Sequence, residues 1–403
     1  MMSRSFKYFL ILFATLVLPC RAQTVDDNYL KGMACLMKNK PEAAIEYFSV
    51  FISQNPNSAA GFMKRADCYY KLRNYNQAVN DYLKAEEITR GIASYSLAKT
   101  YSQTGDFAQA CSCLEKHLQS KYKKSQSELK LDKAFDPLQN SKKWIELWKK
   151  DWYTSSEMAI SDAVYLMKNS KYTEALDELN KAIEEKGSIG NLFACRAKVY
   201  EAMENLKNAL DDYDKALSLS PGNNEYLQQR AGVLMKLNRN EEALSDLNRA
   251  LALDPAQFPL YLKRADVASK LNQYDRAKED VNFFLKYFEN DSSAIYRAGM
   301  IYYNNGNYVE ALGYFNKNLQ NIHNNPAYFE ARANTYLKSG AFNFASKDYS
   351  MALDLDPRNS DLYLCKGKAL SSMQMTKDAC YFWQKAVQYG NREAIELYNK
   401  NCR

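Results

Sequence analysis

Residues 231–265 read AGVLMKLNRNEEALSDLNRALALDPAQFPLYLKRA. Ala231 is followed twelve positions later by Ala243 and 34 positions later by Ala265. Around each alanine, apolar residues recur every three or four positions, which predicts amphipathic helices. Small residues let two helices cross closely. The stretch therefore predicts a helical hairpin that starts again at Ala265.

The same spacing runs through most of the chain. The small residue of the first helix recurs every 34 residues at Ala163, Ala197, Ala231, Ala265, Gly299, Ala333 and Gly367. The small residue of the second helix follows at Ala175, Ala209, Ala243, Ala277, Ala311, Ala345 and Ala379. Hairpins in the same register start at Gly32, Ala66 and Ala98, so ten are predicted. Residues that accept a left-handed backbone lie between the helices at Gly105, Asn238, Asn272, Gly306 and Gly340.

This period and pattern resemble the tetratricopeptide repeat family. The resemblance implies an all-α fold, a right-handed superhelical solenoid of antiparallel helix pairs with about ten regular repeats, one degenerate unit and a C-terminal capping helix. It also implies a non-catalytic scaffold that binds protein or peptide partners. The expected division is a signal peptide at 1–22, three repeats at 23–117, a degenerate Lys- and Trp-rich unit at 118–155, seven repeats at 156–390 and a cap at 391–403.

The N-terminal segment predicts export. Arg4 and Lys7 precede an apolar run at 8–18 that is too short to span a bilayer. We expect cleavage before Gln23 and a mature chain without a transmembrane span, in the periplasm or associated with an outer membrane. The alternatives are a lipid anchor at Cys20 and an uncleaved segment. The Gln23 start also resembles exported repeat proteins of Bacteroidetes-like bacteria.

Charge and composition exclude several function classes. The net charge of +7 falls to +4 without the three basic residues of the N-terminal segment, too diffuse a surplus for nucleic-acid binding. His117 and His323 are the only histidines, which leaves little room for metal or acid-base chemistry. No constellation of serine, cysteine or carboxylate is placed for catalysis, so we expect neither an enzyme nor a cofactor. The oligomeric state stays open.

A second regularity links the two helices of five repeats. Arginines precede the small residue of the first helix, and aspartates follow them sixteen positions later. The pairs are Arg65 with Asp81, Arg196 with Asp212, Arg230 with Asp246, Arg264 with Asp280, and Arg332 with Asp348. Five copies do not provide the one special environment that an active site needs. We interpret them as structural ion pairs.

The first helices predict an apolar, Tyr- and Met-rich groove, because the resembled family binds ligands through this face. Its expected peptide-binding residues are Tyr29, Met63, Tyr70, Tyr95, Ile160, Leu262, Tyr296 and Tyr303. The family's lysine and asparagine clamp for a C-terminal carboxylate is missing, since Asn334 is the only asparagine at its position and Glu330 has the wrong charge. The alternative is that these side chains are partly buried between neighbouring helices.

Ten lysines, counted from Lys116 through Lys150, lie in or directly before the degenerate unit. Trp144, Trp148 and Trp152 follow a spacing that places them on one helical face. One interpretation is an apolar stripe that seals the junction between the two repeat arrays. The other is a lysine-fringed aromatic surface for an acidic peptide, a glycan or lipid headgroups, which would make the chain an accessory glycan- or envelope-binding factor.

Two cysteines near the C-terminus predict a disulfide. Cys380 opens the last second helix and Cys402 closes the capping helix, so antiparallel packing brings them together. The alternative is two unpaired thiols. Cys111 and Cys113 point to opposite sides of one helix, which favours packing over a redox pair or a zinc site with His117.

Overall fold

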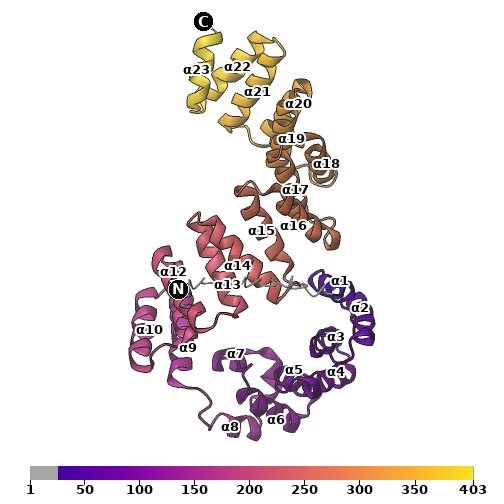
Figure 1. Cartoon of the computed structure of the whole chain (residues 1–403), viewed down its shortest axis with the longest axis vertical. Coiled ribbons are helices and arrows are strands. Elements are labelled where there is room, and N and C mark those ends of the chain that lie inside the picture. The colour runs from indigo at the N-terminus through magenta and orange to yellow at the C-terminus, as the bar shows by residue number, and fades with distance from the viewer. Residues whose placement is uncertain (1–25, 403) are drawn as a thin grey trace, which may run out of the picture.

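The computed structural model describes residues 26–402, so the predicted signal segment and the Cys20 anchor lie outside the described residues. Within this range, every regular element is a helix, and ten helical hairpins follow one another along the chain (Figure 1). This confirms the predicted all-α solenoid; its handedness stays a prediction.

The hairpins fall on both sides of an irregular junction. The first three comprise α1 (Asp27–Met37), α2 (Pro41–Gln54), α3 (Ala59–Lys71), α4 (Tyr75–Ile88), α5 (Ser94–Thr104) and α6 (Phe107–Leu118). The next four comprise α9 (Ser155–Lys168), α10 (Tyr172–Lys186), α11 (Gly190–Ala202), α12 (Leu206–Leu219), α13 (Asn224–Lys236), α14 (Asn240–Leu253), α15 (Phe258–Lys270) and α16 (Tyr274–Tyr287). The last three comprise α17 (Ser292–Asn304), α18 (Tyr308–Leu319), α19 (Pro326–Lys338), α20 (Phe342–Leu355), α21 (Ser360–Ser372) and α22 (Thr376–Gln388), and α23 (Arg392–Asn401) follows them. We number the hairpins repeats 1 to 10.

The small residues lie where the two helices of a repeat cross. Ala231 and Ala243 are almost completely buried. In repeat 8 this crossing carries glycine, and a Cβ atom on Gly299 would lie 2.4 Å from the ring of Phe315. Glycine therefore leaves room for the phenylalanine ring at this crossing.

Each hairpin turns through one residue with a left-handed backbone. These residues are Asn39, Arg73, Gly105, Ser170, Glu204, Asn238, Asn272, Gly306, Gly340 and Gln374, and their φ angles lie between 53° and 82°. All five predicted positions are confirmed. Arg73, Glu204 and Gln374 carry side chains that disfavour this conformation, at a cost of about 1 kcal/mol each. The repeat geometry therefore overrides local preference.

The predicted arginine–aspartate pairs form in all five repeats, and each arginine also contacts the preceding repeat. Arg264 donates from Nε and Nη2 to the two carboxylate oxygens of Asp280, at 2.8 and 2.6 Å. Its Nη1 donates to Asn248 on the second helix of the preceding repeat, at 3.0 Å. One side chain thus connects three helices. The other four pairs repeat this pattern, with Ser49, Asn180, Asp214 and Asn316 as third partners.

The degenerate unit expected at 118–155 is the junction between the two arrays, and it contains no long helical hairpin. It consists of α7 (Gln126–Leu131), the 3-10 helix η1 (Lys133–Leu138) and α8 (Lys142–Leu147). Each short helix starts at a capping side chain, supplied by Ser125, Asp132 and Ser141. Three separate caps and no pair of small crossing residues explain why two long helices do not form.

The chain returns on itself before it ends. Repeats 1 to 7 and the junction curve around so that α1 lies beside α15 and α16 (Figure 1). Repeats 8 to 10 then extend away from this curve, and α23 packs against α22 at the far end (Figure 1). The described chain is therefore a curved body with a straight extension.

The predicted disulfide is present. Cys380 at the start of α22 is bonded to Cys402 at the end of α23, with their Cα atoms 5.6 Å apart. The bond ties the capping helix to the last repeat, where α23 otherwise has a neighbour on one side only. Six further cysteines of the described range are free.

We expect that removal of the Asp246 carboxylate destabilises the solenoid. Asp246→Ala leaves the half-buried Arg230 without its main partner, which should cost roughly 2–4 kcal/mol in the free energy of unfolding. Asp275→Ala is the matched control, because Asp275 is 93% exposed in its pair with Lys278 and should cost under about 1 kcal/mol. Denaturant unfolding measures both, and equal values would contradict a structural role for the pair.

We also expect that the disulfide holds α23 in place. The bond closes a loop of 22 residues, for which chain entropy predicts about 3 kcal/mol of stabilisation. In Cys402→Ser, amide hydrogen exchange should accelerate in α23 and the end of α22, while repeats 1 to 7 keep their exchange rates. Unchanged exchange in α23 would show that packing alone fixes the cap.

Candidate functional site

The first helices of the repeats form the inner side of the solenoid. Neighbouring first helices contact one another directly, as α1 does α3, α9 does α11 and α15 does α17. This close spacing puts them on the concave face. The eight predicted groove residues lie on these helices and are all half-buried: Tyr29, Met63, Tyr70, Tyr95, Ile160, Leu262, Tyr296 and Tyr303.

The structure does not gather these eight residues into one surface. Tyr70 lines a cavity in the first array and Tyr296 a cavity near α17. Tyr29 and Leu262 meet in the contact between repeats 1 and 7. Tyr95 is covered by the junction, where it packs on Phe135 and donates its hydroxyl hydrogen to Asp132. Met63, Ile160 and Tyr303 pack against the clusters of their own repeats.

The first cavity has a volume of about 360 Å³ and lies between α1, α3 and α5. Leu36 and Tyr70 form its apolar part. Asp67 lies beside them, accepts a 2.7 Å hydrogen bond from Tyr82, and has a pKa raised above its ordinary value by burial. Lys99 lies 5.4 Å from the centre of the Tyr70 ring. The cavity thus combines an aromatic wall with a half-buried acceptor and a cation.

The second cavity has a volume of about 340 Å³ and lies between α13, α15 and α17. Met235 and Tyr296 form its apolar part. Asp266 pairs with Arg297 at 3.1 Å, and burial raises its pKa above the ordinary value. Burial also raises the pKa of Tyr296, so this phenol stays neutral and can donate a hydrogen bond.

The two cavities share a motif that the sequence analysis missed. In both repeats, an aspartate directly follows the small residue of the first helix and a lysine follows four positions later: Asp67 with Lys71, and Asp266 with Lys270. The amino-acid sequence alone shows this motif, because both pairs occupy equivalent positions on first helices.

Ion pairs connect neighbouring first helices along the rest of the groove. Lys198 pairs with Glu225 at 2.7 Å, and Lys236 pairs with Glu201 at 3.3 Å. These four charges of the concave face are therefore paired between neighbouring repeats. Such a surface favours recognition by apolar contact and hydrogen bonding over recognition by net charge.

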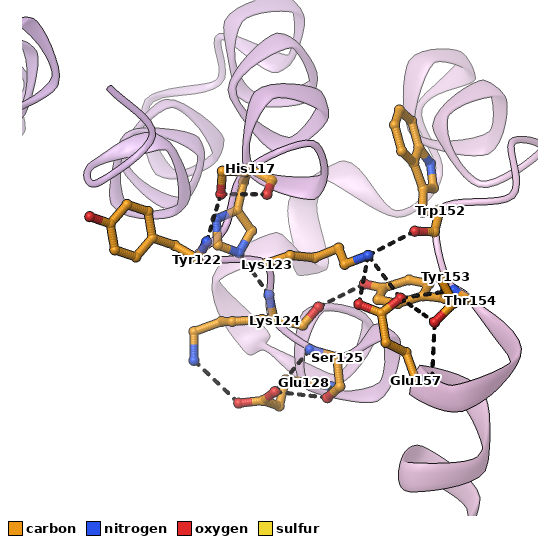
Figure 2. A network of polar contacts seen from close by, with 11 residues as sticks. His117, Tyr122, Lys123, Lys124, Ser125, Glu128, Trp152, Tyr153, Thr154 and Glu157 are labelled. Carbon is orange, nitrogen blue, oxygen red and sulfur yellow. Dashed lines mark hydrogen bonds and ion pairs between the residues drawn. The ribbon is translucent and has the colours of Figure 1, made fainter. Parts of the chain in front are cut away.

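A polar network joins the junction to α9 (Figure 2). Lys123 donates from Nζ to the carbonyl oxygen of Trp152 at 3.0 Å and pairs with Glu157 at 2.7 Å. Tyr153 donates from its hydroxyl group to the carbonyl oxygen of Lys124 at 2.9 Å. These bonds fix the start of the second array against the first. Lys123 contributes through its side chain and Lys124 through its backbone carbonyl group.

The three tryptophans lie within the same junction. Trp144 is only 7% exposed and packs against Phe135 and Trp148. Trp152 lies beyond the end of α8 at Leu147 and donates from Nε1 to the carbonyl oxygen of that residue at 2.7 Å. The three rings therefore do not share one helical face, which corrects the expectation from their spacing. Their contacts support the interpretation as a seal.

Other candidate chemistry is buried. Burial raises the pKa of Cys113 to about 11 and lowers the pKa of His117 to about 4, so both are uncharged at neutral pH. Cys111 is also buried, and burial raises its pKa. Within residues 26–402, no group of three or more histidine, cysteine, aspartate or glutamate side chains is placed to hold a metal ion. No helix of this range has the length and apolar character needed to cross a membrane.

Comparisons with known proteins agree with this architecture. A tetratricopeptide repeat profile matches residues 29–96, 196–258 and 262–326, and a second tetratricopeptide repeat profile matches residues 93–128. Together these segments cover more than half of the chain. Comparison with curated proteins finds no match.

Solved structures with low sequence identity to the chain were also found. The C-terminal part of a repeat protein from Cytophaga hutchinsonii is 19% identical with a TM-score of 0.50, over 59% of this chain and 98% of that one. A tetratricopeptide repeat protein from Parabacteroides merdae is 23% identical with a TM-score of 0.49, over 62% and 99%. Yeast Tom70 is 15% identical with a TM-score of 0.38, over 93% and 95%.

Tetratricopeptide repeats bind protein partners, and their fold is typically non-catalytic. The paired helices, the 34-residue period and the profile matches agree along the chain. The chain therefore belongs to the tetratricopeptide repeat family and is a protein–protein interaction scaffold.

Proposed function

We propose that this chain is an exported scaffold of the bacterial cell envelope that holds peptide segments of a partner protein in its concave groove. The observation that carries the proposal is the pair of cavities at Tyr70 and Tyr296. Each combines an aromatic wall, a half-buried aspartate and nearby cations. An extended peptide offers apolar side chains to such walls and N–H and C=O groups to such acceptors and donors.

The proposed export to the cell envelope rests on the N-terminal segment, with its basic residues, short apolar run and small residues before Gln23. The disulfide at Cys380 and Cys402 supports it, because disulfides persist in oxidising compartments. The alternative of a glycan- or envelope-binding tryptophan surface has less support, since Trp144 is buried and Trp152 is bonded within the junction.

We expect a partner to crosslink to both cavities. A photoreactive phenylalanine analogue at Tyr70 or Tyr296 should capture the same discrete protein in intact cells. The same analogue at Tyr381, which is 54% exposed on the second helix α22, is the matched control and should not capture it. In Tyr70→Ala/Tyr296→Ala, binding of that partner should weaken at least about tenfold, because buried tyrosines dominate such interfaces.

Different crosslinked proteins at the two cavities, or capture at Tyr381 alone, would contradict a shared groove. A tryptophan fluorescence change with envelope polysaccharide that needs Trp148 would instead favour the glycan alternative. Far-UV circular dichroism of the double variant checks that its helices are retained.

We also expect the mature chain to begin at Gln23. Mass spectrometry of the N-terminal peptide from the native protein measures this directly. A diacylated Cys20 would favour the lipid anchor, and a retained Met1 would contradict export.

A further inference from the structure

Helix α1 has two apolar faces, although it starts the solenoid. One face packs on its own repeat, where Gly32 contacts Phe48 of α2. The other face carries Asp27, Leu30 and Ala34, which follow one another at helical spacing. Leu30 and Ala34 are 4% and 3% exposed, respectively. The second face is therefore covered, although no repeat precedes it in the described chain.

Repeat 7 covers this second face. Leu30 and Ala34 pack in one cluster with Phe258 of α15 and with Phe284 and Tyr287 of α16. At the edge of the contact, Asp27 accepts hydrogen bonds from Nζ of Lys286 and from the hydroxyl group of Tyr287, both at 2.7 Å. Lys38 at the other end of α1 lies 5.2 Å from the centre of the Phe288 ring.

The sequence is unusual on both sides of the contact. Most first helices carry a polar residue where α1 carries Leu30, as the list Lys64, Ser96, Ser161, Gln229, Lys263 and Arg297 shows. Most second helices carry alanine where α16 carries Phe284, as the list Ala85, Ala182, Ala216, Ala250, Ala352 and Ala386 shows. A repeat folds without either side chain. Both Leu30 and Phe284 depart from the commonest residue type at their positions, and both are buried in the contact.

We propose that α1 is a releasable latch. It docks on an aromatic surface of repeat 7 and so closes repeats 1 to 7 and the junction into a ring. The surface consists of Ala256, Phe258, Phe284 and Tyr287, with Ala294 of α17 beside them. Its occupant is the amphipathic α1 of the same chain, whose Asp27 complements Lys286.

Release does not require unfolding, because the two faces of α1 are separate. The face with Gly32 stays packed on α2 when the face with Leu30 leaves repeat 7. Opening also uncovers Tyr29 and Leu262, which pack against the contact from opposite ends of the ring. The latch therefore controls access to two of the predicted groove residues. The dimensions of the closed and open forms can be measured without a partner, so the latch can be tested independently of the proposed peptide binding.

Leu30→Lys tests the latch in the full chain. Lysine occupies the equivalent position at Lys64, so repeat 1 should keep its helices while the contact with repeat 7 opens. Small-angle X-ray scattering should show a larger radius of gyration, and amide exchange near Tyr287 should accelerate at least about tenfold. Met37→Lys is the matched control, because Met37 lies on the same helix and is 49% exposed. It should leave both measurements at wild-type values.

A charge exchange gives an independent test. Asp27→Lys faces Lys286 and should open the ring, whereas Asp27→Lys combined with Lys286→Asp should restore the wild-type dimensions. Glu42→Lys makes the same charge change on α2, where Glu42 is exposed, and should have no effect. If Leu30→Lys loses helix by circular dichroism, the charge exchange decides the question.

Wild-type dimensions in both Leu30→Lys and Asp27→Lys would overturn the latch. A wild-type dimer in light scattering that becomes a monomer in Leu30→Lys would also overturn it, because α1 would then occupy repeat 7 of a second copy. A monomeric wild type that expands in Leu30→Lys and regains its dimensions on charge exchange supports the closed ring.

Discussion

The arginines of the first helices set the geometry of the solenoid. The guanidinium group is planar and rigid, so two of its nitrogens can hold an aspartate on the second helix of the same repeat while a third holds the preceding repeat. In repeat 6, Arg230 holds Asp246 and Asp214 in this way. The angle within a repeat and the step between repeats therefore depend on one side chain. Because the aspartate is buried, the pair tolerates little displacement.

The course of the chain changes where this arginine is missing. Leu97 and Asp162 take its place on the two sides of the junction, where three short helices replace a hairpin. Ala298 takes its place in repeat 8, where the extension leaves the curved body (Figure 1). There Tyr314 bonds to Asn282 of the preceding repeat instead. A phenol supplies one hydrogen bond where the guanidinium supplies three, so these steps are less constrained.

The repeats were predictable because their evidence is local and recurs. Each period shows its small crossing residues and turn residue within 34 positions, and the disulfide of Cys380 follows from the antiparallel register. The junction was less predictable. Trp144 and Trp152 have helical spacing, but α8 ends between them at Leu147. The contact of Leu30 with Phe284 was not predictable. It depends on the accumulated curvature of seven repeats, which no single period encodes.

The two ends of the solenoid are covered in different ways. A terminal repeat exposes one apolar face that an internal repeat buries against its neighbour. At the C-terminus, α23 covers this face and Cys402 fixes it covalently. At the start of the described chain, repeat 7 covers the face of α1 with non-covalent contacts and the exposed pair of Asp27 and Lys286. One end is therefore closed by a covalent bond and the other by non-covalent contacts. Because Leu30 and Ala34 are buried in the contact with repeat 7 while Asp27 and Lys286 are both partly exposed, release of α1 would change the exposed apolar surface more than the exposed charge.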